Sequence, residues 1–229
     1  MNASDKAIGP PTWIKCEQGS DEWKRARLGK ITGSRFKDVM TKGRAGDVFG
    51  KVASGYAIDI LCERLTKEPQ DEIKAKQLEW GKLHEASARL EYFMATSHHV
   101  ENVGFAISGE YPDVGASVDG LVGDDGCLEI KCPFNSKIHL LNLQSSVVPS
   151  DYIWQVQGGP WVTQRKWCDF VSYDPRMPED YRLSIIRVNR DEKLIAQLEE
   201  RIVLFRNLIK ETEDRFANQI ESKASKRLG

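Results

Sequence analysis

The sequence predicts a single domain of mixed α/β type, in which helices flank a central mixed β-sheet. Residues 71–97 and 191–220 carry apolar side chains at helical spacing, whereas between residues 100 and 132 the period changes to two and glycines interrupt the chain. The chain has 229 residues, of which 40% are hydrophobic, and it shows no internal repeat or low-complexity linker. This composition suffices for one sizeable core and gives no reason to divide the chain.

The N-terminal part is predicted to be mainly helical. We expect residues 1–12 to form a flexible arm and residues 21–28 to form a short helix that Ser20 caps and Gly29 ends. Glycine and proline residues indicate where the next helices and loops begin and end. In order, they are a helix from Thr32 or Gly33 to about residue 41, a loop with three glycines over 42–50, and a helix over 56–65.

The helix at residues 71–97 carries two lines of side chains. The first line is predicted to be the buried stripe and consists of Ile73, Trp80, Leu83, Ser87, Leu90 and Met94. The second line runs along another side and consists of Leu78, Gly81, Glu85, Ala88 and Tyr92. Glu85 is thus placed among small and apolar neighbours, where an unpaired carboxylate is costly, so we expect a cation or a metal ion beside it.

From residue 100 to residue 132 we expect a β-meander of about three strands. The elements predicted after it are helices over 135–144 and 151–164, strands over 168–173 and 183–188, and a long helix over 191–220. Pro160 predicts a kink at the preceding Gly158 and Gly159. The apolar stripe of the long helix predicts a lid packed on the sheet, and residues 221–229 form a basic tail that we expect to be flexible.

Asp119, Glu129 and Lys131 form the most informative pattern in the chain. Alternate residues of a strand point to the same face, so Glu129 and Lys131 project together if residues 128–132 form a strand. Asp119, at the end of a preceding short strand, can reach the same point. Two carboxylates and one ammonium group make a poor core but a suitable site for Mg²⁺ and its bound water, which indicates a metal-dependent phosphodiesterase. The alternative is a turn followed by a solvated ion pair.

Charge and cysteine content narrow the functional classes. There are 33 basic and 34 acidic residues, so DNA binding requires a local basic lining rather than a basic protein. The five cysteines form no C-x₂-C pair and are odd in number, which argues against a zinc site and a disulfide framework and favours a reducing cytosol. We see no signal-peptide pattern and no run near the ~20 apolar residues of a membrane span, so we expect a soluble, cytoplasmic protein.

The order of the motifs resembles the lambda exonuclease family of viral recombination nucleases, which belongs to the PD-(D/E)xK superfamily. The matching segments lie in the same order over about residues 17–193 and comprise EQGSDEW (17–23), RLGKITGS (27–34), WGK (80–82), SVDG (117–120), LEIKCPF (128–134), QVQ (155–157), WVT (161–163) and YDPRM (173–177). Each motif is modest by itself, but their order is specific. The resemblance implies a restriction-endonuclease-like fold.

The resemblance also implies an activity and partners. It implies a nuclease that degrades one strand of a DNA duplex in the 5′→3′ direction from an end and leaves 3′ single-stranded overhangs for recombination by strand annealing. It implies a ring-shaped homotrimer that acts on double-stranded DNA ends with a single-strand-annealing recombinase, in the cytoplasm of a bacterial host of a phage or prophage. It implies two Mg²⁺ ions per active site, which Mn²⁺ can replace, and no membrane partner.

Carried onto this sequence, the resemblance assigns the metal ligands to Glu85, Asp119, Glu129 and the carbonyl of Ile130. Paired metal ions about 3.5–4 Å apart stabilise the attacking and leaving oxygens of an in-line displacement. Lys131 would orient or deprotonate the water, and nearby metal ions would favour its neutral amine. Gln157 would hold the nucleophile or the scissile phosphate. Gln155 is the alternative, since residues two apart on a helix face nearly opposite ways, and either glutamine can also be a surface amide.

A second cluster matches the family's pocket for a terminal 5′-phosphate and consists of Arg27, Ser34 and Ser117. Arginine supplies a rigid donor fork for phosphate, and Ser34 lies in the first turn of a predicted helix, where free N–H groups attract anions. Leu78 matches a residue that wedges between bases at the duplex end, or else it is a core leucine. Arg44 matches a residue that enters the minor groove, or else it is an exposed loop residue.

Two other functions stay open. One is a structure- or sequence-dependent endonuclease of the same fold, and the other is a catalytically inactive DNA-binding module. The complete set of carboxylates together with Lys131 argues against the inactive module. A zinc hydrolase is disfavoured because the sequence has no His/Cys cluster with ligand spacing.

Overall fold

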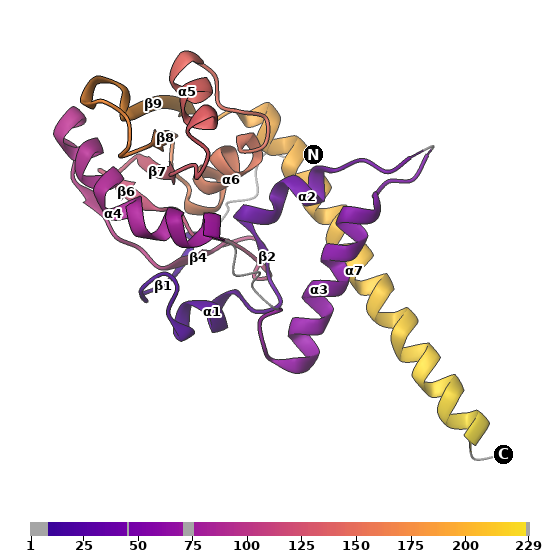
Figure 1. Ribbon diagram of the computed structural model, residues 1–229. Coiled ribbons are helices and arrows are strands. Elements are labelled where there is room, and N and C mark those ends of the chain that lie inside the picture. The colour runs from indigo at the N-terminus through magenta and orange to yellow at the C-terminus, as the bar shows by residue number, and fades with distance from the viewer. Residues whose placement is uncertain (1–8, 45, 71–75, 228–229) are drawn as a thin grey trace, which may run out of the picture.

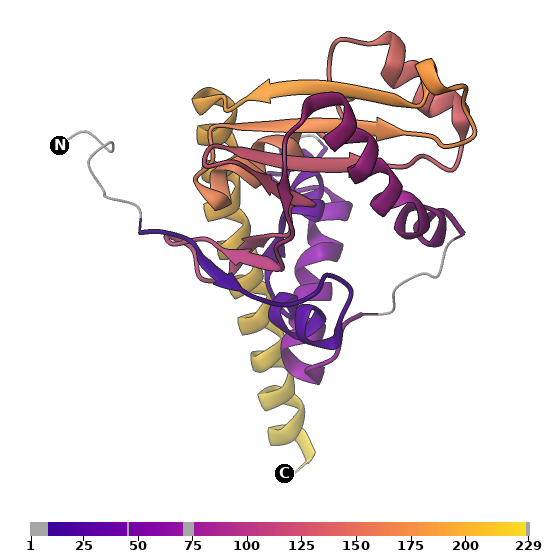
Figure 2. The same ribbon diagram turned by 90° about the vertical axis from the view of Figure 1, so that its left-hand side faces the viewer.

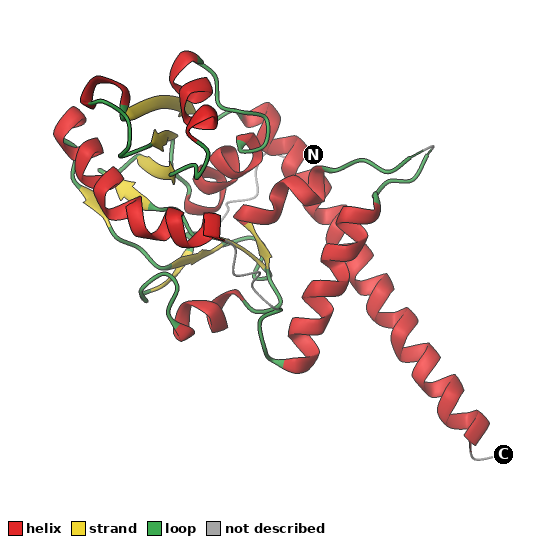
Figure 3. Ribbon diagram, in the orientation of Figure 1, coloured by secondary structure: helices red, strands yellow, loops and turns green. Residues whose placement is uncertain are grey.

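Two mixed β-sheets flanked by helices form the body of the protein in the computed structural model, which describes residues 9–44, 46–70 and 76–227 (Figures 1 and 3). The four-stranded sheet has the order β1-β4-β5-β2 and contains β1 (Thr12–Ile14), β4 (Phe105–Ile107), β5 (Val114–Ala116) and β2 (Ile31–Thr32). The five-stranded sheet has the order β3-β6-β7-β8-β9 and contains β3 (Val100–Glu101), β6 (Gly120–Val122), β7 (Gly126–Lys131), β8 (Trp167–Tyr173) and β9 (Leu183–Asn189). The predicted mixed α/β class is therefore confirmed.

The parallel pair of β7 and β8 forms the centre of the larger sheet. In its register Glu129 lies opposite Phe170, and Lys131 lies opposite Ser172. A tight turn cannot join parallel strands, so the chain returns through a helical crossover. This crossover consists of α5 (Ser136–Gln144) and α6 (Ile153–Thr163), and it carries the chain from the end of β7 to the start of β8.

Helices cover both faces of the five-stranded sheet. On one face, α4 (Lys76–Thr96) contributes Ala88 and Tyr92 to an apolar cluster with Leu128 of β7. On the other face, α6 contributes Val156 to a cluster with Cys127 of β7. Figure 2 shows α4 lying across the long strands of this sheet. Both alternating sets of β7 side chains are thus enclosed, so the polar residues of β7 lie inside the protein rather than on its surface.

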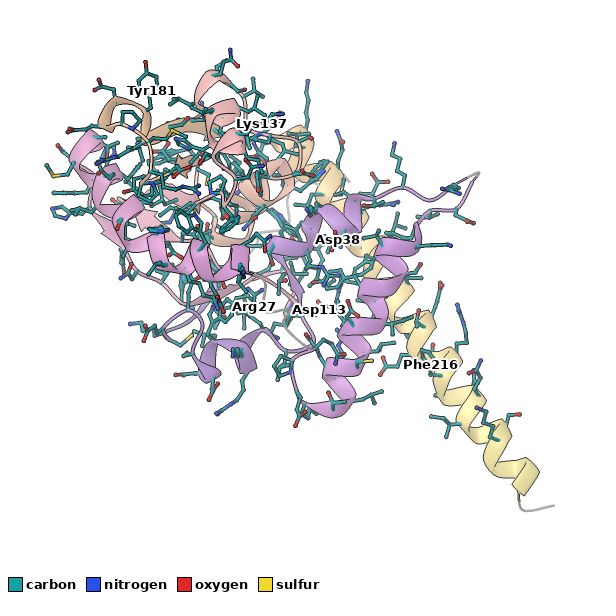
Figure 4. All side chains as sticks on the ribbon, viewed as in Figure 1. Arg27, Asp38, Asp113, Lys137, Tyr181 and Phe216 are labelled. Atoms are coloured by element: carbon teal, nitrogen blue, oxygen red, sulfur yellow. The ribbon has the colours of Figure 1, made fainter. Side chains whose placement is uncertain are left out.

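A third apolar cluster packs the four-stranded sheet against four helices. It lies where α2 (Phe36–Met40), α3 (Lys51–Thr66), α6 and α7 (Glu192–Arg227) meet. Gly158 and Gly159 allow α6 to approach closely, since a Cβ at Gly158 would lie 2.3 Å from the Phe36 ring. The connecting elements are α1 (Asp21–Arg27) and the 3-10 turns η1 (Gly33–Arg35) and η2 (Glu179–Tyr181). α7 extends well beyond the body, and Figure 4 labels Phe216 on this extension.

The buried face of α4 differs from the prediction. Ala88 and Tyr92 of the second line are fully buried. The predicted stripe is instead exposed by 70%, 62% and 71% at Leu83, Leu90 and Met94. The small Ala88 allows α4 to lie close to the sheet, and the Tyr92 hydroxyl donates a hydrogen bond to Asp169 of β8 at 2.7 Å. Ile73 lies outside the described residues.

Several predicted boundaries are also wrong. The meander contains five short strands shared between two sheets, and the helix expected from Thr32 or Gly33 is η1 followed by α2. α3 begins at Lys51 rather than at residue 56, and Thr12, expected in the arm, belongs to β1. Residues 221–227, expected to be a flexible tail, continue α7 as helix. Within the described ranges, no helix combines the length and apolar character needed to cross a membrane.

Candidate active site

A cleft of about 590 Å³ opens where β7 ends. The first half of α4 supplies one wall, and the segment that follows β7 supplies another. The lining includes Glu85, Asp119, Ile130, Lys131 and Tyr152. Three of the four residues predicted as metal ligands therefore border one cleft, together with the predicted catalytic lysine.

β7 turns Glu129 and Lys131 to the same side, as the alternation of a strand requires. Nζ of Lys131 lies 2.5 Å from Oε1 of Glu129, which is only 3% exposed. Asp119 joins them from directly before β6, rather than from the end of a strand as predicted. Its Oδ2 accepts a hydrogen bond from the N–H of Ile130 at 2.6 Å, and its own N–H donates to the carbonyl of Leu128 at 2.9 Å. Two hydrogen bonds to β7 thus hold Asp119 beside Glu129.

Burial and repulsion make this arrangement of anions unfavourable. Burial raises the pKa of Asp119 well above its usual value, and the charge of Glu129 raises it further. Burial also raises the pKa of Glu129, although Lys131 opposes this shift. Burial disfavours the charged form of Lys131, but Glu129 and Asp119 outweigh it and raise the pKa of the amine. A single ammonium group does not relieve the carboxylates, so a further cation would stabilise the site.

Glu85 reaches the same cleft from α4. Its Oε1 lies 2.9 Å from Nη2 of Arg89, and its charge adds to the repulsion on Asp119 and Glu129. Among the described residues, no three His, Cys, Asp or Glu side chains stand close enough to form a metal cluster. Glu85 is paired with Arg89, and Glu129 is paired with Lys131. Carboxylate and carbonyl oxygens are nevertheless the ligands that suit Mg²⁺, so this donor set fits such an ion chemically.

The structure does not bring Gln157 to the cleft. Its side chain is 2% exposed, its Nε2 donates to the carbonyl of Asn189 at 3.0 Å, and its Oε1 accepts from the N–H of Asp191 at 2.9 Å. Gln157 therefore joins α6 to the connection between β9 and α7. Its predicted contact with the nucleophile or the scissile phosphate stays a prediction. Gln155, the alternative, is half-buried and is not among the residues that line the cleft.

Tyr152 is a cleft residue that the sequence reasoning missed. Nζ of Lys131 lies 5.1 Å from the centre of its ring, which packs on Phe170 of β8 with ring centres 5.4 Å apart. Tyr152 lies directly before α6 and three residues before Gln155. Residues at this spacing share one side of a helix, which is the signal that could have indicated Tyr152.

The predicted phosphate cluster does come together. Nη1 of Arg27 donates to Oγ of Ser117 at 3.2 Å, and Nη2 donates to Oγ of Ser34 at 3.4 Å. Nε1 of Trp23 donates to the same Ser117 oxygen at 2.8 Å, and the Arg27 guanidinium lies 4.2 Å from the Trp23 ring centre. Ser34 lies in η1, a single 3-10 turn, rather than in the first turn of an α-helix as predicted. The three predicted residues thus form one hydrogen-bonded cluster, which Trp23 joins, and their binding of a phosphate stays a prediction.

α1 and the turn after it set the position of Arg27. Ser20 caps α1 as predicted, because its Oγ accepts from the N–H of Trp23 at 3.2 Å. Gly29 has a φ of 66°, a conformation that favours glycine, and ends this segment. Glu63 and Arg64 of α3 then hold Gly29, through hydrogen bonds of 2.8 Å to its N–H and 3.0 Å to its carbonyl. The last turn of α1 is therefore fixed to the end of α3.

Two predicted DNA contacts lie in different parts of the molecule. Leu78 lines the cleft and is 44% exposed, so the core interpretation is wrong, while its role as a wedge stays a prediction. Arg44 is exposed in the loop between α2 and α3, which extends away from the body (Figure 1). Figure 4 labels Arg27 below α4 in that view, whereas Lys137 and Tyr181 lie above it. All five cysteines are free thiols in the structure.

A comparison with known protein families assigns the chain to one of them. The profile of the YqaJ-like viral recombinase domain matches residues 22–166. The chain belongs to the YqaJ-like viral recombinase family. A comparison with curated proteins gives no match.

Solved structures support the family and its fold. The crystal structure of an alkaline exonuclease (LHK-Exo) from Laribacter hongkongensis aligns with a TM-score of 0.79 and 36% identity, over 90% of this chain and 100% of that chain. LHK-Exo in complex with dAMP gives a TM-score of 0.79 and 37% identity, with the same coverage. A phage related exonuclease from Haemophilus somnus 129PT shares the fold, with a TM-score of 0.64 and 15% identity over 82% of this chain and 96% of that chain. The predicted lambda exonuclease family and PD-(D/E)xK fold are confirmed, and a nuclease function is supported.

We expect Asp119→Asn to raise the Tm of the metal-free protein by a few degrees at pH 7. The amide oxygen still accepts from Ile130, but the charge that repels Glu129 is gone. In a chain of this length about 1 kcal/mol corresponds to about 2–4 °C. The pKa of Asp119 is raised in the folded protein, so the ionised carboxylate destabilises the wild type above that pKa. The difference in Tm between Asp119→Asn and the wild type should therefore shrink as the pH falls and Asp119 takes up a proton.

Differential scanning calorimetry in the presence of a chelator measures this difference. Asp124→Asn, which changes an exposed carboxylate in the turn before β7, is the matched control and should leave the Tm unchanged. A Tm for Asp119→Asn that equals or falls below that of the wild type at pH 7 would contradict the electrostatic account.

Proposed function

We propose that this protein is a Mg²⁺-dependent 5′→3′ exonuclease that degrades one strand of a DNA duplex from its end and leaves 3′ single-stranded overhangs for recombination by strand annealing. One observation carries the proposal: Ser117 belongs to the cluster around Arg27, and Asp119, two residues later, belongs to the carboxylate set. Two residues of chain span at most about 7 Å. A strand whose terminal phosphate contacts Ser117 would therefore present a nearby phosphodiester to Asp119.

The two sites have separate tasks in this mechanism. The fork of Arg27, with the hydroxyls of Ser34 and Ser117, would bind the terminal 5′-phosphate and set which phosphodiester reaches the cleft. Glu85, Asp119, Glu129 and the carbonyl of Ile130 would hold the metal ions. When bound, such ions lower the pKa of water and neutralise charge on the leaving oxygen.

Lys131 would act within the carboxylate site. Its ammonium holds Glu129 in place at 2.5 Å, and in the reaction it would orient the attacking water or stabilise the charge that develops on the phosphate. The ring of Tyr152 lies beside this amine, with its centre 5.1 Å from Nζ. When metal ions are bound, we expect their positive charge to favour the neutral amine of Lys131, and this stays a prediction.

The oligomeric state of the protein is part of the same proposal. A chain with a net charge of −1 has little non-specific attraction for DNA, because that attraction comes from neutralising many phosphates at once. Continuous digestion then requires confinement, which a ring-shaped homotrimer provides. The exposed Leu83, Leu90 and Met94 on α4 offer apolar surface for contact with another protein chain. We propose that the ring acts with a single-strand-annealing recombinase in the bacterial cytoplasm and that Mn²⁺ can replace Mg²⁺.

One experiment separates the exonuclease from its rivals. A linear duplex labelled separately at each 5′ and 3′ end should lose its 5′ labels first, and a closed circular plasmid should stay intact. Cleavage of the closed circle would favour an endonuclease of the same fold. No cleavage of either DNA in Mg²⁺ or Mn²⁺ would favour a DNA-binding module.

We expect Lys131→Ala to reduce the rate of digestion by about 10²–10³, because a charge contact that forms in the transition state is lost. Lys166→Ala is the control, since Lys166 is 74% exposed in a surface ion pair with Asp125. Release of acid-soluble nucleotides from a linear duplex measures the rate, and circular dichroism checks the fold. Near-normal digestion by Lys131→Ala in Mg²⁺ would refute the assigned role.

A duplex with 5′-phosphates should be digested at least tenfold faster than one with 5′-hydroxyls. Hydrogen bonds to charged groups contribute about 1.5–3 kcal/mol, so the loss of a phosphate contact should be readily measured. Arg27→Ala should shrink this preference, whereas Arg25→Ala, which removes an exposed arginine from the same helix, should keep it. Equal rates of the wild type on both substrates would argue against the phosphate pocket.

In dilute solution, light scattering should give about three times the chain mass of 25.9 kDa. A charged substitution on the exposed face of α4, Leu90→Glu, tests whether that face takes part and should lower the mass if it does. A monomeric wild type that also releases DNA after each cleavage, measured with an excess of unlabelled DNA as trap, would contradict the ring.

A further inference from the structure

Two motifs of the family resemblance, WGK (80–82) and YDPRM (173–177), and the last residue of a third, LEIKCPF (128–134), have no task in the proposed reaction, and the structure brings a residue from each to the same place. Trp80 comes from α4, Phe134 from the segment after β7, and Arg176 from the segment after β8. The rings of Trp80 and Phe134 meet edge to face, with centres 5.9 Å apart and planes at 88°. The Arg176 guanidinium lies over the Trp80 ring, 4.4 Å from its centre. This Arg–Trp–Phe cluster lies beside the cleft, whose lining includes Phe134.

Arg176 holds the ends of two neighbouring strands together. Its Nε and Nη2 each donate to the carboxylate of Asp174 at 2.8 Å. Nη2 also donates to the carbonyls of Pro133 and Phe134, at 3.3 and 3.0 Å. Asp174 follows β8 and is fully buried, whereas Pro133 and Phe134 follow β7. Burial alone would raise the pKa of Asp174, but hydrogen bonds from Arg176 and Ser136 lower it to about 2, so this ion pair persists across the working pH range.

Trp80 is a residue of α4, so its contact with Arg176 attaches this helix to the ends of the two strands. Glu85 lies five residues after Trp80, and His84 packs on Trp80 with ring centres 4.0 Å apart. Within the described part of the chain, neither Nε1 of Trp80 nor Nε2 of His84 has a hydrogen-bond partner. The Trp80 contacts with Arg176, Phe134 and His84 are therefore made through its ring rather than through its polar atom.

A second anchor holds α4 beyond Glu85. The hydroxyl of Tyr92 donates to Asp169 of β8 at 2.7 Å, and Arg187 of β9 donates to both oxygens of Asp169 at 2.8 Å. α4 is thus attached at Trp80 and at Tyr92, on either side of Glu85, and both attachments lead to an aspartate in or directly after β8. Since β8 pairs with β7, which carries Glu129, the two anchors fix Glu85 relative to Glu129.

We propose that Arg176 is a positioning residue that sets the place of Glu85 opposite Asp119 and Glu129, acting through the ring of Trp80. The inference rests on the proposed function, because it takes Glu85 as a metal ligand. Lysine cannot replace arginine in this role. It has no planar group to stack on Trp80 and no fork that serves Asp174 and two carbonyls together.

The test is the affinity for Mn²⁺, measured by isothermal titration calorimetry on the metal-free full-length protein without DNA. Residues that orient metal ligands typically contribute 10–100-fold to affinity, so Arg176→Lys should weaken Mn²⁺ binding by about tenfold or more. Arg182→Lys is the matched control, since Arg182 lies six residues later and donates to the carbonyl of Met177 at 2.8 Å. It should bind Mn²⁺ as the wild type does.

A second pair of variants separates positioning from general destabilisation. Trp80→Ala should weaken Mn²⁺ binding, whereas Trp80→Phe, which keeps a ring under the guanidinium, should restore it. Digestion by Arg176→Lys should need more Mg²⁺ for half-maximal rate and should approach the wild-type rate at saturating Mg²⁺. Circular dichroism identifies any variant that does not fold, and if Arg176→Lys is one, the Trp80 pair decides.

The outcomes that contradict the inference are distinct from those that contradict the proposed function. A folded Arg176→Lys with wild-type Mn²⁺ affinity, or a Trp80→Phe variant as weak as Trp80→Ala, would overturn the positioning role alone. A wild type and an Arg182→Lys variant that both fail to bind Mn²⁺ would overturn the metal-dependent function and this inference with it.

Discussion

The parallel pairing of β7 with β8 is the constraint on which the rest of the molecule depends. It places Glu129 and Lys131 at one end of the central strand, opposite Phe170 and Ser172 of β8. Asp169 lies within β8, and Asp174 directly follows it. The parallel pairing also requires a helical crossover, which supplies α6 as the cover of one face. α4 covers the other face and is attached to β8. The cleft forms where these layers end, so its shape follows from the pairing of two strands.

The local chemistry of the site could be predicted from the sequence, because it follows from the alternation of a strand. Glu129 and Lys131 share a face, and Ser20 caps α1, as short-range rules require. The buried face of α4 could not be predicted in this way. Two apolar lines satisfy the same helical period, and the partner that selects between them, Asp169, lies 77 residues from Tyr92.

Other differences have similar causes. Gln157 matches a family motif, but its orientation depends on the backbone of Asn189 and Asp191, which no local pattern reveals. The cluster of Arg27, Ser34 and Ser117 followed from the resemblance, because spacing within the sequence does not indicate that these segments meet. The end of α7 was expected to be a flexible tail because it is basic. Phe216 and Ile220, one helical turn apart and both exposed, instead belong to a helix that continues without a break to Arg227.

The contacts that complete the site join segments far apart in the chain, and this affects how the protein acquires its activity. Arg27 meets Ser117 across 90 residues, and Tyr92 meets Asp169 across 77. Such closures are slow, because the entropy of a long loop must be lost before the contact stabilises the fold. During synthesis, α4 with Glu85 leaves the ribosome well before β8, to which it is later attached. The unfinished chain therefore lacks the support that aligns its carboxylates, and nuclease activity should appear only after β8 has joined the sheet.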